Sequence, residues 1–203
     1  MKIICIGRNY LAHVKELDNA LPTEPMFFMK PETALLPPGA PFAYPDFSKE
    51  VHYETELVLR ISKRGHAIAE ASASDYYDAI TVGVDFTARD LQRDCKAKGH
   101  PWEKAKAFDG SAPMGEFKEI SALSHPDDIA FGMKLNGVWV QQGHSRDMIF
   151  SFNCIVAHVS RFVTLEEGDC IFTGTPQGVG EVHVGDTLEL FLENEPVFSF
   201  EVK

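Results

Sequence analysis

The chain has 203 residues, with 30 Asp or Glu against 19 Lys or Arg, so its formal charge is −11. A protein this acidic is a poor ligand for a phosphate backbone, which argues against a nucleic-acid partner. No apolar run approaches the roughly 20 residues of a membrane span, and the opening MKIICIG lacks the long apolar region of a signal peptide. We therefore expect a cytoplasmic globular protein with one domain over residues 1–203.

In chain order, short apolar runs predict strands at Ile3–Ile6, Met26–Met29, Val51–Ile61, Ala79–Phe86, Ile129–Leu135, Val138–Gln141, Asp169–Thr173, Thr187–Leu192 and Val197–Val202. Helices are expected between them at Asn9–Leu17, Ala73–Tyr77, Arg89–Lys98 and Asp147–Phe162. For Arg89–Lys98, Thr87 is a candidate N-cap and Gly99 a stop signal. Seven prolines between residues 22 and 45 predict a long ordered loop around one short strand. Because strands outnumber the scattered helices, the pattern favours a mainly β, α+β fold.

The four cysteines, Cys5, Cys95, Cys154 and Cys170, are too far apart in the sequence to form a CxxC motif. This spacing excludes a zinc knuckle or a thioredoxin-type site. We expect free thiols without a catalytic role, in a reducing compartment.

The segment VHYETELVLRI carries two acids, Glu54 and Glu56, that a continuous strand would place on one face, one pleat apart. Like charges so close repel unless a cation or solvent lies between them, and Mg²⁺ prefers such carboxylate oxygens. The same pattern also fits an exposed face of an edge strand. His52 shares this face and could support a metal ligand indirectly.

A third acid, Asp85, ends the predicted strand ITVGVDF just before a helix. An acid at the end of a strand is well placed to face a cleft, although it could also cap the helix. Three carboxylates would leave open positions on a metal ion for a bidentate substrate.

Two further segments carry groups suited to acid–base or electrostatic catalysis. In NYLAHVKE, a helix would place His13 and Glu16 on one face, where the carboxylate would raise the basicity of the imidazole for water activation. Taken alone, the same pattern also fits an ordinary charged surface helix. In WEKAKAFDGSAP, Lys104 or Lys106 would stabilise an enolate or carboxylate if it lay inside a cleft, although the segment taken alone also fits solvated loop lysines. The turn TGTPQGVG lacks the GK[ST] of a P-loop, but its glycines allow close approach to a small anion.

Seven stretches, taken together and in order, resemble the fumarylacetoacetate hydrolase (FAH) family, especially its small acylpyruvase and oxaloacetate decarboxylase members. These stretches are GRNYLAHVKE, FFMKPETAL, VHYETEL, GVDFTARDLQ, KGHPWEKAKAFDGSAP, MIFSFNCIVAHVS and LEEGDCIFTGTPQGVG, spanning residues 7 to about 180. The resemblance implies a mixed β-sandwich roll, usually dimeric. The extra N-terminal domain of the larger family members is not present in these 203 residues, which argues against fumarylacetoacetate as the substrate.

The resemblance also assigns site residues. It implies Mg²⁺ or Mn²⁺ on Glu54, Glu56 and Asp85, a His13–Glu16 dyad and a catalytic lysine at Lys106. It implies substrate contacts from the four remaining positions, Arg89, Gln92, Thr175 and Lys30.

From these assignments we expect a metal-dependent hydrolase that cleaves acylpyruvates (2,4-dioxo acids) to pyruvate and a carboxylate, with possible decarboxylation of oxaloacetate. Two alternatives stay open at this stage. One is an isomerase of an unsaturated 2-oxo diacid of the hydroxymuconate type, and the other is an oxaloacetate decarboxylase or tautomerase as the main activity.

Overall fold

The computed structural model describes residues 1–16, 20–37, 39–126 and 128–203, and its strands form three sheets. The predicted end of the first helix, Leu17, lies outside the described residues. The largest sheet has six strands in the order β2 (Met26–Lys30), β1 (Ile3–Gly7), β10 (Cys170–Phe172), β4 (Thr55–Ile61), β5 (Tyr77–Val84) and β7 (Lys118–Glu119). A three-stranded sheet contains β11 (Gly180–Glu181), β3 (Val51–Tyr53) and β6 (Thr87–Ala88). A four-stranded sheet contains β13 (Glu195–Glu201), β12 (Thr187–Leu192), β8 (Ala130–Leu135) and β9 (Val138–His144).

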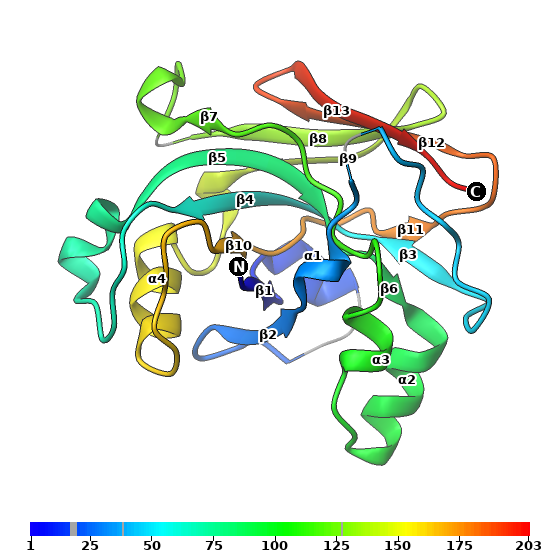
Figure 1. The fold of residues 1–203 in the computed structure, drawn as a ribbon, viewed down its shortest axis with the longest axis horizontal. Helices are drawn as coiled ribbons and strands as arrows, with labels where there is room; N and C mark the ends of the chain where they lie inside the picture. The colour runs from blue at the N-terminus through cyan, green and yellow to red at the C-terminus, as the bar shows by residue number, and fades with distance from the viewer. Residues whose placement is uncertain (17–19, 38, 127) are drawn as a thin grey trace.

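The helices are short and lie around these sheets (Figure 1). α4 (Phe152–Ser160) covers one end of the molecule, while α2 (Arg89–Lys98) and α3 (Glu103–Lys106) lie together at the other end. The six-residue α1 (Leu11–Glu16) lies between these two ends. Short 3₁₀ turns occur at Glu32–Ala34, Glu70–Tyr76, Ile120–Ala122 and Ser145–Asp147.

A buried apolar cluster runs from β1, β4 and β5 to the strands of the four-stranded sheet. β4 pairs with β10 on one side and β5 on the other, and both of its faces are covered. Burial of such surface contributes about 25 cal/mol per Å², so β4 is among the most constrained segments of the fold. The mainly β, α+β prediction is confirmed.

The predicted continuous strand over Val51–Ile61 is wrong, because the chain changes sheets at Glu54. β3 pairs with β11 and β6, whereas β4 belongs to the six-stranded sheet. At the junction the backbone N–H of Thr55 donates to Oε1 of Gln141, 2.8 Å away, rather than to a strand partner. Apolar alternation continues through the junction, so the sequence pattern alone carries no sign of it.

Arg89–Lys98 is a helix, as predicted, and Gly99 ends it with φ 64°. Thr87 does not cap this helix, since the N-cap is Ala88 and makes no side-chain bond. The helix predicted over Asp147–Phe162 is shorter: Ser151 caps α4 by accepting from the N–H of Cys154, and Phe162 beyond its end is exposed. Ala73–Tyr77 is part of a 3₁₀ turn.

The described part of the chain holds no helix long and apolar enough to cross a membrane. Its four cysteines are free; Cys5, Cys95 and Cys170 are buried and Cys154 is partly buried. This state agrees with the expected free thiols.

Candidate active site

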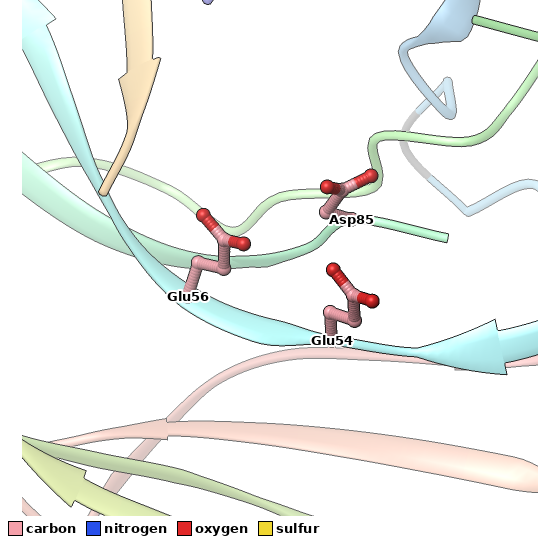
Figure 2. Close-up of side chains that lie close together, drawn as sticks. All are labelled: Glu54, Glu56 and Asp85. Carbon is pink, nitrogen blue, oxygen red and sulfur yellow. The ribbon is translucent and has the colours of Figure 1, made fainter. Parts of the chain in front are cut away.

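Three carboxylates converge beside the junction of β3 and β4. Ligand oxygens of Glu54, Glu56 and Asp85 all lie within 4.8 Å of one another, and the three residues are buried. Figure 2 shows Glu54 and Glu56 beside Asp85, which lies on the segment that follows β5. The backbone holds the cluster together as well, because the N–H of Asp85 donates to the carbonyl of Glu54 at 2.8 Å.

This burial decides between the alternatives left open for these residues. The exposed-edge interpretation is wrong, since Glu56 is 1% exposed and lies in a strand paired on both sides. The capping interpretation of Asp85 is also wrong, because its carboxylate binds lysine side chains and the cap of α2 is Ala88.

Lysine and arginine side chains hold two of the acids in place. Lys106 Nζ donates to Glu54 Oε2 at 2.9 Å and to Asp85 Oδ2 at 2.6 Å, and Arg89 Nη2 donates to Glu54 Oε1 at 2.6 Å. Burial alone would raise the pKa of Glu54, but Lys106 and Arg89 outweigh it and hold that pKa well below its usual range. Burial would likewise lower the pKa of Lys106, and Asp85 and Glu54 reverse this, so the lysine stays charged.

Glu56 is in the opposite electrostatic situation. Burial, followed by the Asp85 and Glu54 carboxylates, raises the pKa of Glu56 well above its usual range. One bond opposes this rise, from the N–H of Gly174 to Glu56 Oε2 at 2.7 Å. A divalent cation among the three acids would favour the ionised form of Glu56.

The oxygens present fit such a cation. Asp85 Oδ1 is buried without a hydrogen-bond donor, although Lys30 Nζ is 2.7 Å away as an ion-pair partner. The protons of Lys30 are already directed to the Ser111 carbonyl, the Ser111 hydroxyl and the Phe86 carbonyl. Three carboxylates, one with an oxygen lacking a donor, form a set of ligands suited to a hard divalent ion.

The loop that follows β10 is fixed against the other end of the site. Gly174 has φ 101°, and a Cβ at this position would lie 2.6 Å from Asn9 Cβ. The side chain of Asn9 donates to the carbonyls of Thr173 and Phe150 and accepts from the N–H of Phe150. Asn9 therefore joins the start of α1 to the loop that contacts Glu56.

The predicted dyad is formed on α1. His13 Nδ1 lies 3.0 Å from Glu16 Oε2, and Oε1 of the same carboxylate accepts from the N–H of Gly178 at 2.9 Å. His13 is buried and lines the cavity, whereas Glu16 lies behind it. This arrangement fixes the imidazole by its Nδ1 side.

One face of α2 carries two of the residues that are predicted to contact the substrate. Arg89 and Gln92 are one turn apart and bond to each other at 2.7 Å through Arg89 Nη1 and Gln92 Oε1, while Arg89 Nε has no partner in the described residues. From the opposite side, Thr175 Oγ1 accepts from Nε2 of Gln141 at 2.9 Å.

Eight of the ten predicted site residues line one cavity: His13, Glu54, Glu56, Asp85, Arg89, Gln92, Lys106 and Thr175. Glu16 does not line this cavity, but it contacts His13, which does. Lys30 lies beneath Asp85 and outside the lining, so its expected substrate contact stays a prediction, and its contacts are those of a support for Asp85.

Two other residues considered from the sequence, Lys104 and His52, do not line the cavity. Lys104 is exposed on the one-turn α3, whereas Lys106 is buried. His52 is half-buried and pairs with Glu50, 3.2 Å from Nε2, outside the cavity lining.

Sequence reasoning missed several residues of the same cavity, including Arg8, Lys96, Phe28 and Trp102. Lys96 could have been found from spacing, because it follows Gln92 by four residues and shares the helix face of Arg89 and Gln92. Arg8 carries no such periodic signal.

A buried carboxylate triad beside a histidine–glutamate pair and a buried lysine is a set of residues suited to a metal-dependent enzyme. The family model "Fumarylacetoacetate (FAA) hydrolase C-terminal" matches residues 2–202. The chain therefore belongs to the fumarylacetoacetate hydrolase family, and it is an enzyme of that family.

Named relatives differ in their reactions. The chain is 42% identical over 201 residues to "Oxaloacetate tautomerase FAHD1, mitochondrial" of Mus musculus, covering 99% of this chain and 91% of the mouse protein. It is 37% identical, with TM-score 0.93, to fumarylpyruvate hydrolase from Pseudomonas aeruginosa in complex with Mn²⁺ and pyruvate, covering 100% and 89% of the two chains. It is 32% identical, with TM-score 0.87, to 5-carboxymethyl-2-hydroxymuconate delta-isomerase from Mycobacterium smegmatis, covering 99% and 78%.

Proposed function

We propose that this protein is a divalent-metal-dependent enzyme of 2-oxo acids that hydrolyses acylpyruvates to pyruvate and a carboxylate. The observation that carries this proposal is the convergence of three carboxylates, Lys106, Arg89 and His13 on one cavity. The complex of the Pseudomonas relative with Mn²⁺ and pyruvate supports both the metal and the 2-oxo acid product.

Glu54, Glu56 and Asp85 are the proposed ligands of Mg²⁺ or Mn²⁺. When bound, the ion supplies Lewis-acid polarisation of the 2-oxo acid and stabilises negative charge on its oxygens. Arg89, Gln92 and Thr175 orient the substrate carboxylate, because all three line the cavity and carry polar side chains. Lys30 holds Asp85 from behind and acts as a positioning residue.

The chain's own groups account for the proton transfers. His13, oriented by Glu16, accepts a proton from a water molecule that adds to the distal carbonyl. The bond between that carbonyl carbon and the pyruvate methylene then breaks, and its electron pair goes to pyruvate enolate. The charge of Lys106 stabilises this enolate, which takes up a proton to become pyruvate.

Reaction on oxaloacetate is the second candidate, favoured by the tautomerase relatives. Decarboxylation gives the same enolate without attack by water, and tautomerisation needs only proton transfer. The hydroxymuconate isomerase relative supports the isomerase alternative in the same way. One cavity could therefore support all three reactions.

A substrate panel tests the proposal. Purified protein is incubated with acetylpyruvate, fumarylpyruvate, oxaloacetate or a hydroxymuconate, with Mg²⁺, with Mn²⁺ or with EDTA, and each ultraviolet absorbance is followed. We expect metal-dependent hydrolysis, at least 100-fold slower in Lys106→Met. Lys104→Met, an exposed lysine on the same helical turn, is the control and should keep its rate. Turnover that survives complete metal removal would overturn the proposal.

Three broader expectations belong with this proposal: a homodimer, a cytoplasmic location and a single catalytic domain over residues 1–203. The free cysteines support a reducing compartment, although the named tautomerase relatives are mitochondrial. Light scattering of the purified protein tests the dimer.

A further inference from the structure

Two cations at the cavity have no acidic partner within the described residues. Arg8 and Lys96 both line the cavity, and neither side chain forms an ion pair or hydrogen bond with any described group. Lys96 lies over the Trp102 ring, 5.5 Å from its centroid, which limits where its ammonium group can go. Burial, followed by the Arg8 and Arg89 guanidinium groups, lowers the pKa of Lys96, so these cations act on one another.

The acids of the inner site do not need these two charges. Glu54 and Asp85 already pair with three cations, Lys30, Lys106 and Arg89, and Glu56 accepts from the N–H of Gly174. Arg8 and Lys96 are therefore additional positive charges in the lining of the same cavity.

Lys96 lies further along the helix face of α2 that carries Arg89 and Gln92. Arg89, Gln92 and Lys96 lie three and four residues apart, which places them along one face of the helix. A helix rises about 1.5 Å per residue, so Lys96 lies about 6 Å beyond Gln92 along the axis. That separation is comparable to the length of a short diacid whose first carboxylate is held near Arg89 and Gln92.

The backbone of Arg8 is in an unfavourable conformation. Arg8 has φ 62°, in the left-handed region that residues other than glycine seldom adopt. Such strain is typical of positions that hold a side chain at a ligand site. Here it holds the arginine directly after β1 and against the cavity.

From this arrangement we propose that Arg8 and Lys96 bind the second carboxylate of a dicarboxylic 2-oxo acid. The inference rests on the proposed function, because that function places the first carboxylate and the 2-oxo group at the inner end of the cavity. The inference narrows the substrate class: we expect 2-oxo diacids to bind more tightly than 2-oxo acids that end in an uncharged group.

Binding of a matched pair of unreactive acids tests this assignment. Mn²⁺-loaded protein is titrated by calorimetry with 2-oxoglutarate and with 2-oxopentanoate, which share five carbons and differ in the terminal carboxylate. The variants are Lys96→Gln, Arg8→Gln and the double substitution. Lys98→Gln is the matched control, because Lys98 lies on the same helix but pairs with Asp94 and does not line the cavity.

We expect the wild-type protein to favour 2-oxoglutarate by about tenfold or more, since one charge-assisted contact is worth at least that factor. The double substitution should bring the ratio of the two dissociation constants to within about threefold, with each single substitution between. Lys96→Gln changes an exposed helical residue, so this variant should fold even if Arg8→Gln does not. Lys98→Gln should keep the wild-type ratio.

The outcomes separate the two proposals. Equal binding of both acids by the wild-type protein would overturn the diacid assignment and leave the proposed function intact. An equal drop in the ratio for Lys98→Gln and Lys96→Gln would show a general charge effect and would also overturn it. Failure of the Mn²⁺-loaded protein to bind either acid would remove the proposed function together with this inference.

Discussion

The protein buries carboxylates in two regions, and it surrounds them with different partners. Asp169, at the start of β10, accepts from the N–H groups of Lys2 and Glu166 and pairs with Lys2 Nζ at 2.6 Å. Each of its oxygens has a backbone donor. In the triad, by contrast, three acids crowd together, the donors are mainly the charged side chains of Lys106 and Arg89, and Lys30 is an ion-pair partner only.

The difference separates a carboxylate that stabilises the fold from carboxylates arranged for chemistry. A buried acid adds stability when hydrogen-bond donors of the chain contact its oxygens, because these hydrogen bonds offset the cost of removing the carboxylate from water. Three neighbouring buried acids repel one another, and the fold tolerates them because strong pairing elsewhere in β4 and β5 holds the backbone.

The largest expected effect comes from removing a site carboxylate. Glu56→Gln preserves the size of the side chain and an oxygen for the Gly174 N–H, but removes one charged ligand. We expect turnover to fall by about 10³-fold or more, since a divalent ion would lose a carboxylate. Metal affinity, measured by Mn²⁺ titration, should fall in parallel. Wild-type turnover in this variant would remove Glu56 from the proposed metal site.

Glu56→Gln should lower turnover but raise the stability of the metal-free folded protein. The folded pKa of Glu56 is raised, while an unfolded glutamate titrates near about 4.3, so the folded metal-free protein retains a proton that the unfolded chain has released. Above about pH 4.3 the wild-type protein therefore loses stability from this group as pH rises. Glu56→Gln should be the more stable protein in EDTA at pH 8, with a smaller advantage at pH 5. Urea unfolding at the two pH values measures this, and an advantage that grows toward acid would contradict it.

The next largest effect on the rate is expected from removing the His13 imidazole, whose proposed role is in the reaction and not in the stability of the fold. His13→Ala should slow acylpyruvate hydrolysis by about 10²-fold or more, because no group remains to take the proton from water. Oxaloacetate decarboxylation should suffer less, since that reaction needs no attacking water. Parallel rate measurements on the two substrates test this, and equal loss of both activities would argue against the division of roles.

Asp169→Ala tests the structural side of the comparison. It leaves two backbone N–H groups and Lys2 without their acceptor, so we expect unfolding to become easier by about 3 kcal/mol. Because Asp169 lies outside the cavity lining, kcat per folded molecule should stay near the wild-type value. Denaturant unfolding and active-site titration measure the two quantities. A stable variant with reduced kcat would mean that this carboxylate also serves the site.

The sequence predicted the residues of the site better than the way in which the fold holds them. The spacing of Glu54 and Glu56 made them candidate metal ligands and the family resemblance assigned them, yet the change of sheet at Glu54 was missed because apolar alternation runs through it. Lys30 has partners from Asp85, Phe86 and Ser111, which no local pattern brings together. The single turn of α3 that buries Lys106 is too short to give a periodic signal. Arg8 was missed because its placement depends on one backbone angle.

The smallest effect is expected from substituting Gln141. This residue contacts both the strand junction, which is structural, and Thr175, which lines the cavity. From β9 it accepts from the N–H of Thr55 at the strand junction, and its Nε2 donates to Thr175 Oγ1 and to the Pro176 carbonyl. Gln141→Leu should raise KM for a 2-oxo acid by about tenfold, with a smaller change in kcat, because the hydroxyl of Thr175 is no longer held in place.

Two further variants separate these contacts. Gln141→Glu can still accept from the N–H of Thr55 but cannot donate to Thr175, so it should keep more stability than Gln141→Leu and share the raised KM. Gln142→Leu, at the exposed neighbouring position, is the control and should change neither. If Gln141→Leu unfolds more easily while its KM stays at the wild-type value, Gln141 only completes the strand junction, and the position of Thr175 is set by the TGTP turn itself.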